Sequence, residues 1–144
     1  MLVANVAMAT GYYTIGNYRY FVDSYYETAS VIEYLGNEED VAIPNMVFVD
    51  GKSYPVISLE SKSFYDKDMA SVNIPSSIKK IESRCFYGCS SLVSIKIPSS
   101  VIEIGEKCFM DCVSLDSVDI SSSVTELEDC CFQNCKSLLS VNIT

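Results

Sequence analysis

Three consecutive blocks of 23 residues share one pattern of apolar, serine and cysteine positions. They are IPSSIKKIESRCFYGCSSLVSIK (74–96), IPSSVIEIGEKCFMDCVSLDSVD (97–119) and ISSSVTELEDCCFQNCKSLLSVN (120–142). A fixed period of this length is typical of solenoids, in which one small supersecondary unit stacks on copies of itself. The period therefore limits the fold to a stack of equivalent rungs, with equivalent residues aligned in columns.

A weaker copy of the same unit occupies residues 43–73 and contains an insertion. It aligns with the three regular copies on their shared phenylalanine, which is Phe64, Phe86, Phe109 and Phe132 in order. The insertion holds Asp50-Gly51 between the β-prone runs MVFV and SYPV. Asp-Gly suits a type I′ turn, which needs positive φ, so we expect a β-hairpin within this first repeat.

Each unit ends in a run of the form L-x-x-I/V-x-I/V, at 69–74, 92–97, 115–120 and 138–143. Alternation at the last two apolar positions predicts a short strand with one buried face. A fifth strand is expected at 41–43. The stretch from Ile104 to Cys112 has apolar residues at helical spacing, which predicts a short α- or 3₁₀-turn on the opposite side of the stack.

The first 42 residues do not repeat and hold seven of the ten tyrosines. GYYTIGNYRYFV and ASVIEYL indicate strands around a polar turn, and a solenoid must cover its first rung. We therefore expect 1–42 to be an N-terminal β-hairpin cap and 43–144 to be the solenoid. The opening MLVANVAMAT has no Lys or Arg and no long apolar core, which favours an expression remnant or a first strand over a signal peptide.

The last predicted strand ends next to Thr144. An uncovered strand edge is unfavourable. Either further repeats belong beyond this point, or the C-terminal rung associates with something, such as a second copy of the chain.

These residues resemble a known family. The pattern I-P-S-S-V-x-x-I-x-x-x-C/A-F-x-x-C-x-S-L-x-S-I/V is similar to BspA-type leucine-rich repeats of bacterial and protist surface proteins, strongly over 74–144 and moderately over 38–73. The resemblance implies a β/α repeat solenoid, a right-handed superhelix with a parallel sheet on its concave face. It also implies adhesion or protein recognition at a cell surface, and hence a surface or secreted location.

Composition argues against several other classes. The net charge of −9 repels phosphate backbones, so no nucleic-acid partner is expected. No apolar run approaches the ~20 residues that a membrane span needs. The chain has no His, and its clustered carboxylates (Glu103, Glu106, Glu126, Glu128 and Asp129) fall at equivalent outer positions of the repeats. This pattern predicts a solvated face, with no enzymatic activity, cofactor or metal.

The cysteines form three C-F-x-x-C pairs, with Cys130 left over. The pairs are Cys85/Cys89, Cys108/Cys112 and Cys131/Cys135. Because each pair lies among apolar positions, we interpret the cysteines first as a buried ladder of small hydrophobic residues. Disulfides between rungs or a thiolate metal site are the alternatives.

The candidate binding face is the outward side of the predicted sheet. Its columns are Ala70/Val93/Asp116/Leu139, Ser71/Ser94/Ser117/Ser140 and Asn73/Lys96/Asp119/Asn142. Solenoids present such surfaces to partners. The alternative is that these small polar residues only solubilise an open sheet, because four rungs give a patch about 15–20 Å long.

The tyrosines of the cap are a second candidate surface: Tyr12, Tyr13, Tyr18, Tyr20, Tyr25 and Tyr26. Tyrosine is enriched in interfaces, but part of this set is also needed to seal the first rung. The sequence thus predicts a non-catalytic module that binds an unidentified protein. An intracellular assembly module, associating end to end through its open repeat edge, is the alternative.

Overall fold

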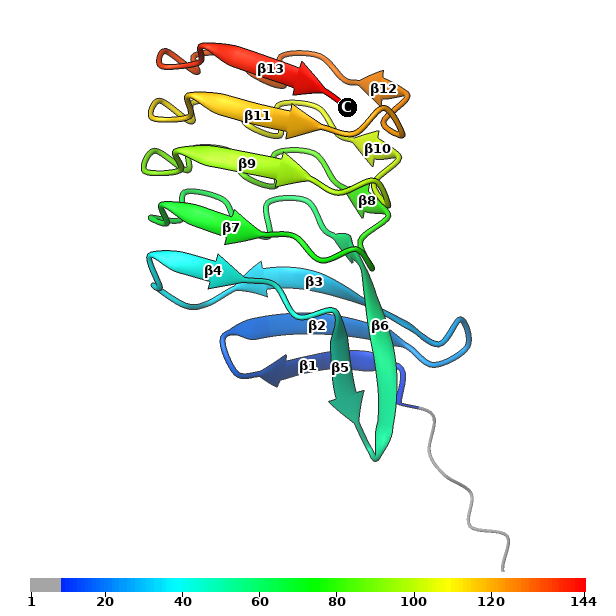
Figure 1. The fold of residues 1–144 in the computed structure, drawn as a ribbon. Helices are drawn as coiled ribbons and strands as arrows, with labels where there is room; N and C mark the ends of the chain where they lie inside the picture. The colour runs from blue at the N-terminus through cyan, green and yellow to red at the C-terminus, as the bar shows by residue number, and fades with distance from the viewer. Residues whose placement is uncertain (1–8) are drawn as a thin grey trace, which may run out of the picture.

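Parallel strands, one from each coil of the chain, form a ladder along one face of the stack in the computed structural model, which describes residues 9–144 (Figure 1). They are β4 (Asp40–Ala42), β7 (Ser71–Asn73), β9 (Ser94–Ile97), β11 (Ser117–Ile120) and β13 (Ser140–Ile143). The β4–β7 and β9–β11–β13 groups are regular parallel sheets, and Val93 N donates to Ala70 O to link β7 with β9. The strands predicted from the L-x-x-I/V-x-I/V runs are confirmed.

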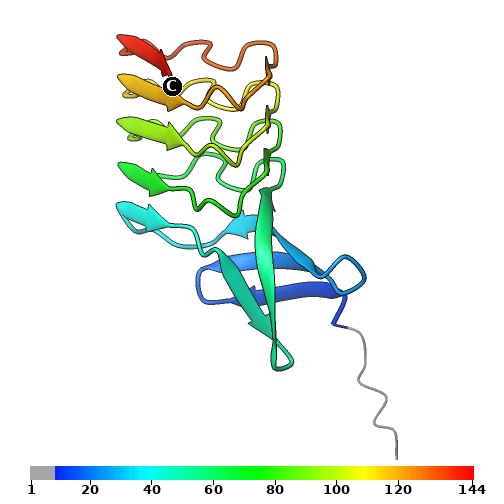
Figure 2. The ribbon, with the colours of Figure 1, turned by 45° about the vertical axis from the view of Figure 1, so that its right-hand side comes forward.

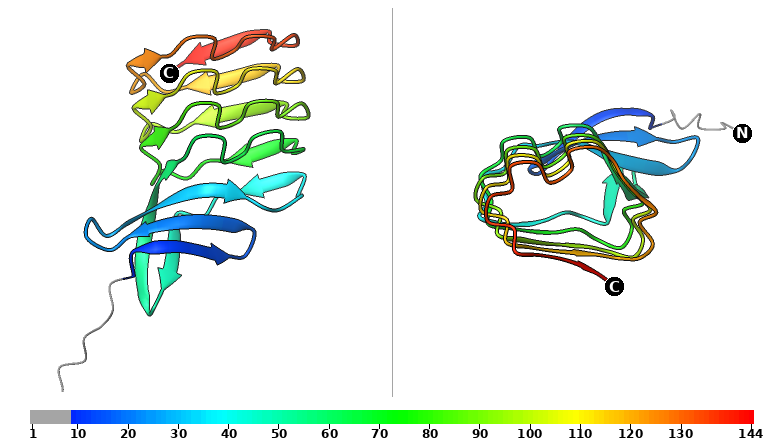
Figure 3. Two further views of the ribbon diagram at one scale, coloured as in Figure 1. Left: turned by 180° about the vertical axis from the view of Figure 1, so that it is seen from behind. Right: turned by 90° about the horizontal axis from the view of Figure 1, so that it is seen from above.

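The period of the sequence is the register of this ladder. Ser117 lies opposite Ser94 on one side and Ser140 on the other, each 23 residues away. Ile95 and Ile97 of β9 are buried and Lys96 between them is exposed, as alternation along a strand requires. Viewed along the stack, the coils superpose on one another (Figure 3, right).

A second set of very short parallel strands runs along another face of the stack. It consists of β8 (Lys80–Ile81), β10 (Glu103–Ile104) and β12 (Glu126–Leu127). β10 lies between β8 and β12, and β8 pairs in parallel with the last residues of β6 (Lys52–Leu59). β6 in turn pairs in parallel with β3 (Thr28–Tyr34). The second ladder therefore connects the repeats directly to the N-terminal sheet.

The N-terminal unit is a three-stranded antiparallel sheet, where a β-hairpin was expected. β1 (Gly11–Ile15) pairs with β2 (Tyr18–Asp23), and β2 pairs with β3. Most of the MLVANVAMAT segment, residues 1–8, lies outside the described residues. β3 is the strand of this sheet that pairs with the solenoid, through β6.

The insertion in the first repeat is a hairpin. β5 (Met46–Val49) pairs antiparallel with the first half of β6, and Asp50 and Gly51 connect them at φ 51° and 77°. Both central residues have positive φ, as the Asp-Gly signal predicted. The hairpin projects beyond the coils on the side of the N-terminal sheet (Figure 2).

The predicted helical turn at residues 104–112 is wrong, and no helix is present in residues 9–144. The β/α class is therefore corrected to a β-solenoid, although the parallel ladder on one face was predicted rightly. Two residues per coil are left-handed, and an α-helix of L-residues cannot continue through them. These left-handed residues form two columns of equivalent positions, with φ between 54° and 72°: Lys62/Arg84/Lys107/Cys130 and Asp66/Gly88/Asp111/Asn134.

The turns that replace the helix are held by hydrogen bonds between coils. Phe64 N donates to Cys85 O at 3.0 Å, and Phe86 N donates to Cys108 O at 2.9 Å. Gly88 tolerates the left-handed conformation because it lacks a Cβ, and Asp and Asn tolerate it better than most residues. The third side of each coil is thus hydrogen-bonded to its neighbours without regular secondary structure.

A column of aromatic rings runs through the centre of the stack. Tyr34 of β3 stacks on Phe64 at 5.3 Å between ring centroids, and the next intervals, along Phe86, Phe109 and Phe132, are 5.1, 5.4 and 5.5 Å. Phe64, Phe86 and Phe109 are completely buried. Because Tyr34 comes from the N-terminal sheet, the column joins that sheet and the repeats in one core.

Removing a ring from this column is expected to destabilise the whole protein. Phe109→Ala leaves a cavity between two neighbouring rings and should lower the free energy of unfolding by about 3–5 kcal/mol, measured by urea denaturation. Phe48→Ala removes the same side chain where it is 72% exposed, and should change stability by less than about 1 kcal/mol. Equal losses in the two variants would contradict a core organised around the column.

Candidate functional site

The outward residues of the β7–β9–β11–β13 ladder lie in the columns expected from the sequence. Pairing places Ser117 between Ser94 and Ser140 and places Asp119 between Lys96 and Asn142. Hydrogen bonds from Asp116 N to Val93 O and from Leu139 N to Asp116 O align the third column, which begins at Ala70. We call this surface the sheet face.

The sheet face mixes exposed and half-buried side chains. Ala70, Ser71, Asp116, Ser117 and Asp119 are half-buried, whereas Asn73, Val93, Ser94, Lys96, Leu139, Ser140 and Asn142 are exposed. Two of its side chains are held by neighbours: Ser71 Oγ donates to Asp40 Oδ1 at 2.6 Å, and Asn142 Nδ2 donates to Asp119 Oδ1 at 2.8 Å. Lys96 forms no salt bridge within residues 9–144.

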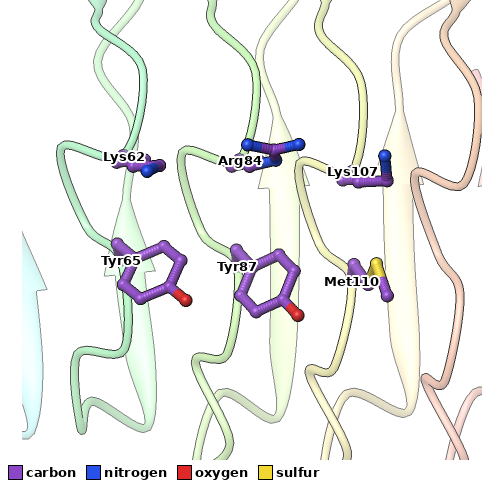
Figure 4. A pocket seen from close by; sticks show the side chains of 6 residues that line it. All are labelled: Lys62, Tyr65, Arg84, Tyr87, Lys107 and Met110. Carbon is purple, nitrogen blue, oxygen red and sulfur yellow. The ribbon is translucent and has the colours of Figure 1, made fainter.

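A second surface, which the sequence analysis did not identify, lies over the turns. Lys62, Arg84 and Lys107 form a basic row, and Tyr65, Tyr87 and Met110 form a parallel row beside it (Figure 4). The six side chains line a shallow cavity of about 250 Å³, which we call the turn groove. In this view the broad strands of the ladder lie behind the turns, so the groove and the sheet face are separate surfaces.

The rings in the turn groove are ordered by their neighbours. Tyr65 and Tyr87 stack at 5.1 Å between centroids with an angle of 9°, and Lys62 Nζ lies 5.7 Å from the Tyr65 centroid. A hydrogen bond to Asp111 raises the pKa of Tyr87, and this carboxylate also accepts a hydrogen bond of 2.8 Å from Asn134. The Tyr87 hydroxyl therefore stays protonated near neutral pH.

A signal for the turn groove was present in the sequence. Alignment on the repeated phenylalanine puts Lys62, Arg84 and Lys107 two positions before it, and Tyr65, Tyr87 and Met110 one position after it. Residues three positions apart lie on one face of a helix, so the expected helical turn would also have brought these two positions together. In the structure Lys62, Arg84 and Lys107 are themselves left-handed residues of their coils, and both rows line the same groove.

The cysteine ladder lies mainly in the core. Cys85, Cys89, Cys108, Cys112 and Cys131 are buried, Cys135 is half-buried and Cys130 is exposed. Cys89, Cys112 and Cys135 each donate to the carbonyl of the preceding rung's phenylalanine, at 3.0–3.1 Å. All seven thiols are free, and residues 9–144 contain no group of three or more Cys, Asp or Glu arranged to hold a metal. The interpretation as a buried ladder is confirmed for five cysteines.

The outer carboxylates contact solvent and neighbouring lysines. Glu103 forms a salt bridge with Lys80, with 3.0 Å between Oε1 and Nζ, and Glu106 forms a salt bridge with Lys107. The hydrogen bond from Lys107 lowers the pKa of Glu106. A carboxylate with a lowered pKa stays ionised near neutral pH, which is the opposite of what a general acid needs.

The tyrosines of the N-terminal sheet divide between the two predicted roles. Tyr18 and Tyr20 are buried against the first rungs, and burial raises the pKa of Tyr20 to about 12. Tyr12, Tyr25 and Tyr26 are 66%, 79% and 71% exposed. Tyr13 is half-buried, so the six residues form no single surface.

A family model for the BspA type leucine rich repeat region matches residues 57–144 in six copies. The match covers more than half of the chain. The chain belongs to this family. No relative among curated proteins matches the sequence. Within residues 9–144, no helix of this BspA-type protein is long and apolar enough to cross a membrane.

Solved structures of bacterial repeat proteins resemble this BspA-type chain. A leucine rich cell surface protein of Faecalibacterium prausnitzii A2-165 is 30% identical with a TM-score of 0.75; the match covers 94% of this chain and 43% of that protein. A leucine-rich repeat protein of Bacteroides capillosus ATCC 29799 is 25% identical with a TM-score of 0.82, and the match covers 92% of this chain and 98% of that protein. The pneumococcal vaccine antigen PcpA shares the fold alone, at 16% identity and a TM-score of 0.60. The match covers 93% of this chain and 50% of that protein.

The seven thiols are expected to differ widely in reactivity. Burial raises the pKa of Cys85 and Cys131 to about 12 and that of Cys135 to about 11, so little reactive thiolate forms in the folded protein near pH 8. With a chromogenic thiol reagent, Cys130 should react fast and Cys135 slowly. The other five should react only when the protein unfolds.

Two controls make this assignment testable. Cys130→Ser should remove the fast phase. In the wild-type protein, all seven thiols should react with the reagent in denaturant without reductant. Fewer than seven would indicate disulfides and contradict the free-thiol core.

Proposed function

We propose that this protein is a non-catalytic recognition module that binds a protein partner through the sheet face. The carrying observation is the register of β9, β11 and β13, continued to β7 by a hydrogen bond, which aligns a serine column and two columns that differ between repeats on one surface. Residues common to the copies, such as the buried phenylalanines, are used for packing. Repeat solenoids use aligned outer columns of this kind as extended binding surfaces.

The sheet face offers both charge and apolar contact. Lys96 and Asp119 lie side by side in the ladder with opposite charge and without a salt bridge to each other. Lys96 is exposed and can pair with a partner, whereas Asp119 is half-buried and already accepts one hydrogen bond, from Asn142. Val93 and Leu139 are 45% and 88% exposed and add apolar area at one edge. This mixture is typical of non-obligate protein interfaces.

The area of the sheet face limits its affinity. Four strands at a spacing of ~4.8 Å span roughly 15 Å, and about four residues of a strand span roughly 13 Å, so the projected area is on the order of 200 Å². This area is well short of the ~800 Å² per partner of a standard interface. The sheet face of this chain alone therefore fits a weak and transient interaction.

A location at the cell surface, with adhesion as the biological role, is part of the same proposal. Its support is the family and the likeness to the cell surface protein of F. prausnitzii, of which this chain spans 43%. The alternative is assembly of copies end to end. In this 144-residue chain β13 pairs with β11 only, and Leu139 and Ile143 are 88% and 73% exposed.

Binding is expected to depend on the two charges of the sheet face. With immobilised extracellular-matrix glycoproteins as probes in biolayer interferometry, Lys96→Ala/Asp119→Ala should weaken binding at least about tenfold, or ~1.4 kcal/mol. The matched control is Arg19→Ala/Glu33→Ala, which removes one salt-bridged charge pair on the N-terminal sheet and should bind like the wild type. Equal affinity of both double variants would exclude the sheet face as the site.

Location and assembly are tested separately. Antibodies against the protein should label intact cells of its source, and labelling only after permeabilisation would contradict a surface role.

Light scattering across a range of concentrations should give the monomer mass. Growth of the mass with concentration, abolished by Leu139→Glu and Ile143→Glu, would instead support end-to-end assembly, because like charges at an edge repel.

A further inference from the structure

The turn groove carries positive charge on an otherwise acidic protein. Lys62, Arg84 and Lys107 follow one another at the rung spacing, although the chain as a whole has a net charge of −9. Lys107 is neutralised by Glu106, but Lys62 and Arg84 form no salt bridge within the part of the chain that the structure describes. Two cations of the groove are therefore available to an anionic ligand.

The same groove provides aromatic surface next to these cations. Tyr65 is 39% exposed and its ring is parallel to that of Tyr87, so the two rings form a stepped platform. Lys62 lies over the edge of this platform, 5.7 Å from the Tyr65 centroid. A ligand that fits must combine an anion with a flat, weakly polar body, because charge and ring lie side by side.

The backbone of the groove is not available to a ligand. Lys62 N donates to Ser83 O, Arg84 N to Glu106 O, and Lys107 N to Asp129 O, at 3.3, 2.9 and 3.0 Å. An extended peptide binds a protein edge mainly through main-chain hydrogen bonds, and these donors are occupied. Recognition at the groove must use side chains alone, which disfavours a peptide strand.

The surrounding charges limit how densely charged the ligand is. Asp66 and Asp111 lie close enough to act on the Tyr87 hydroxyl, and Glu106 lies beside Lys107. Together with the net charge, these carboxylates repel a polyphosphate such as a nucleic acid. A short oligosaccharide with one singly charged carboxylate per unit brings few charges near these acids while it meets the two free cations.

We propose that the turn groove binds an acidic saccharide chain, with carboxylates on Lys62 and Arg84 and sugar rings against Tyr65 and Tyr87. Arg84 can hold a carboxylate by two parallel hydrogen bonds, and Lys62 acts as a point charge. The apolar C–H face of a pyranose ring fits the exposed tyrosine face. Successive cations are about one rung apart, ~4.8 Å, which matches the length of one sugar unit in an extended chain.

The test uses the full chain and an oligogalacturonate of defined length, titrated by calorimetry at low salt. A Kd of roughly 0.1–1 mM is expected for so shallow a site, and binding should weaken as salt screens the charges. The fully methyl-esterified oligomer has the same rings without charge and should not bind. Equal binding of ester and acid would overturn the proposal.

Three single-site variants locate the binding. Arg84→Gln and Lys62→Gln should each raise the Kd at least about tenfold. Lys96→Gln removes the same charge from the sheet face and should leave the Kd unchanged. Circular dichroism establishes that each variant is folded, and unchanged binding in Arg84→Gln would refute the groove.

Two further outcomes would also overturn the proposal. Octaglutamate bound at least as tightly as the saccharide, with the same loss in Arg84→Gln, would assign the groove to acidic peptides. No binding at about 10 mM oligogalacturonate, well above a Kd of roughly 1 mM, would refute a saccharide site. Both results leave the sheet-face experiment unaffected, because that experiment depends on Lys96 and Asp119.

Discussion

Stacking of aromatic rings along the axis is the interaction on which the other features of this protein depend. Tyr34, Phe64, Phe86, Phe109 and Phe132 follow one another at 5.1–5.5 Å, close to the spacing of hydrogen-bonded strands. Each coil places one ring on the last, so the coils align without a shift. A slip by one residue would move the buried side chains of every strand to the outside.

This alignment creates two surfaces of different chemistry. On the sheet face, alternation along β9 and β11 turns Lys96 and Asp119 outward beside each other. Over the turns, the left-handed conformation of Lys62 and Arg84 places their side chains in a row next to the tyrosines. One core thus positions both surfaces, the mixed polar sheet face and the cationic, aromatic turn groove, for which binding is proposed.

The columns of the sheet face were predictable because they follow from the period and from alternation, both of which are local. The Asp50-Gly51 hairpin was predictable for the same reason. The helical turn was predicted wrongly, since the apolar spacing of residues 104–112 also fits two tight turns. Asp66, Gly88, Asp111 and Asn134 are residue types that tolerate positive φ, and that column was the evidence against a helix.

By itself, the 23-residue repeat determined the solenoid, the register of its ladder and the burial of most of its cysteines, because identical units can bury their apolar faces only against each other. Only the tertiary structure decided how the N-terminal sheet joins the stack, through Tyr34 on Phe64, and where the basic and aromatic rows meet. Those arrangements depend on left-handed turns and on contacts between distant segments. The contacts between distant segments have no period in the sequence. The turns do recur with the repeat, but their apolar spacing also fits a helix, so only their φ angles distinguish them.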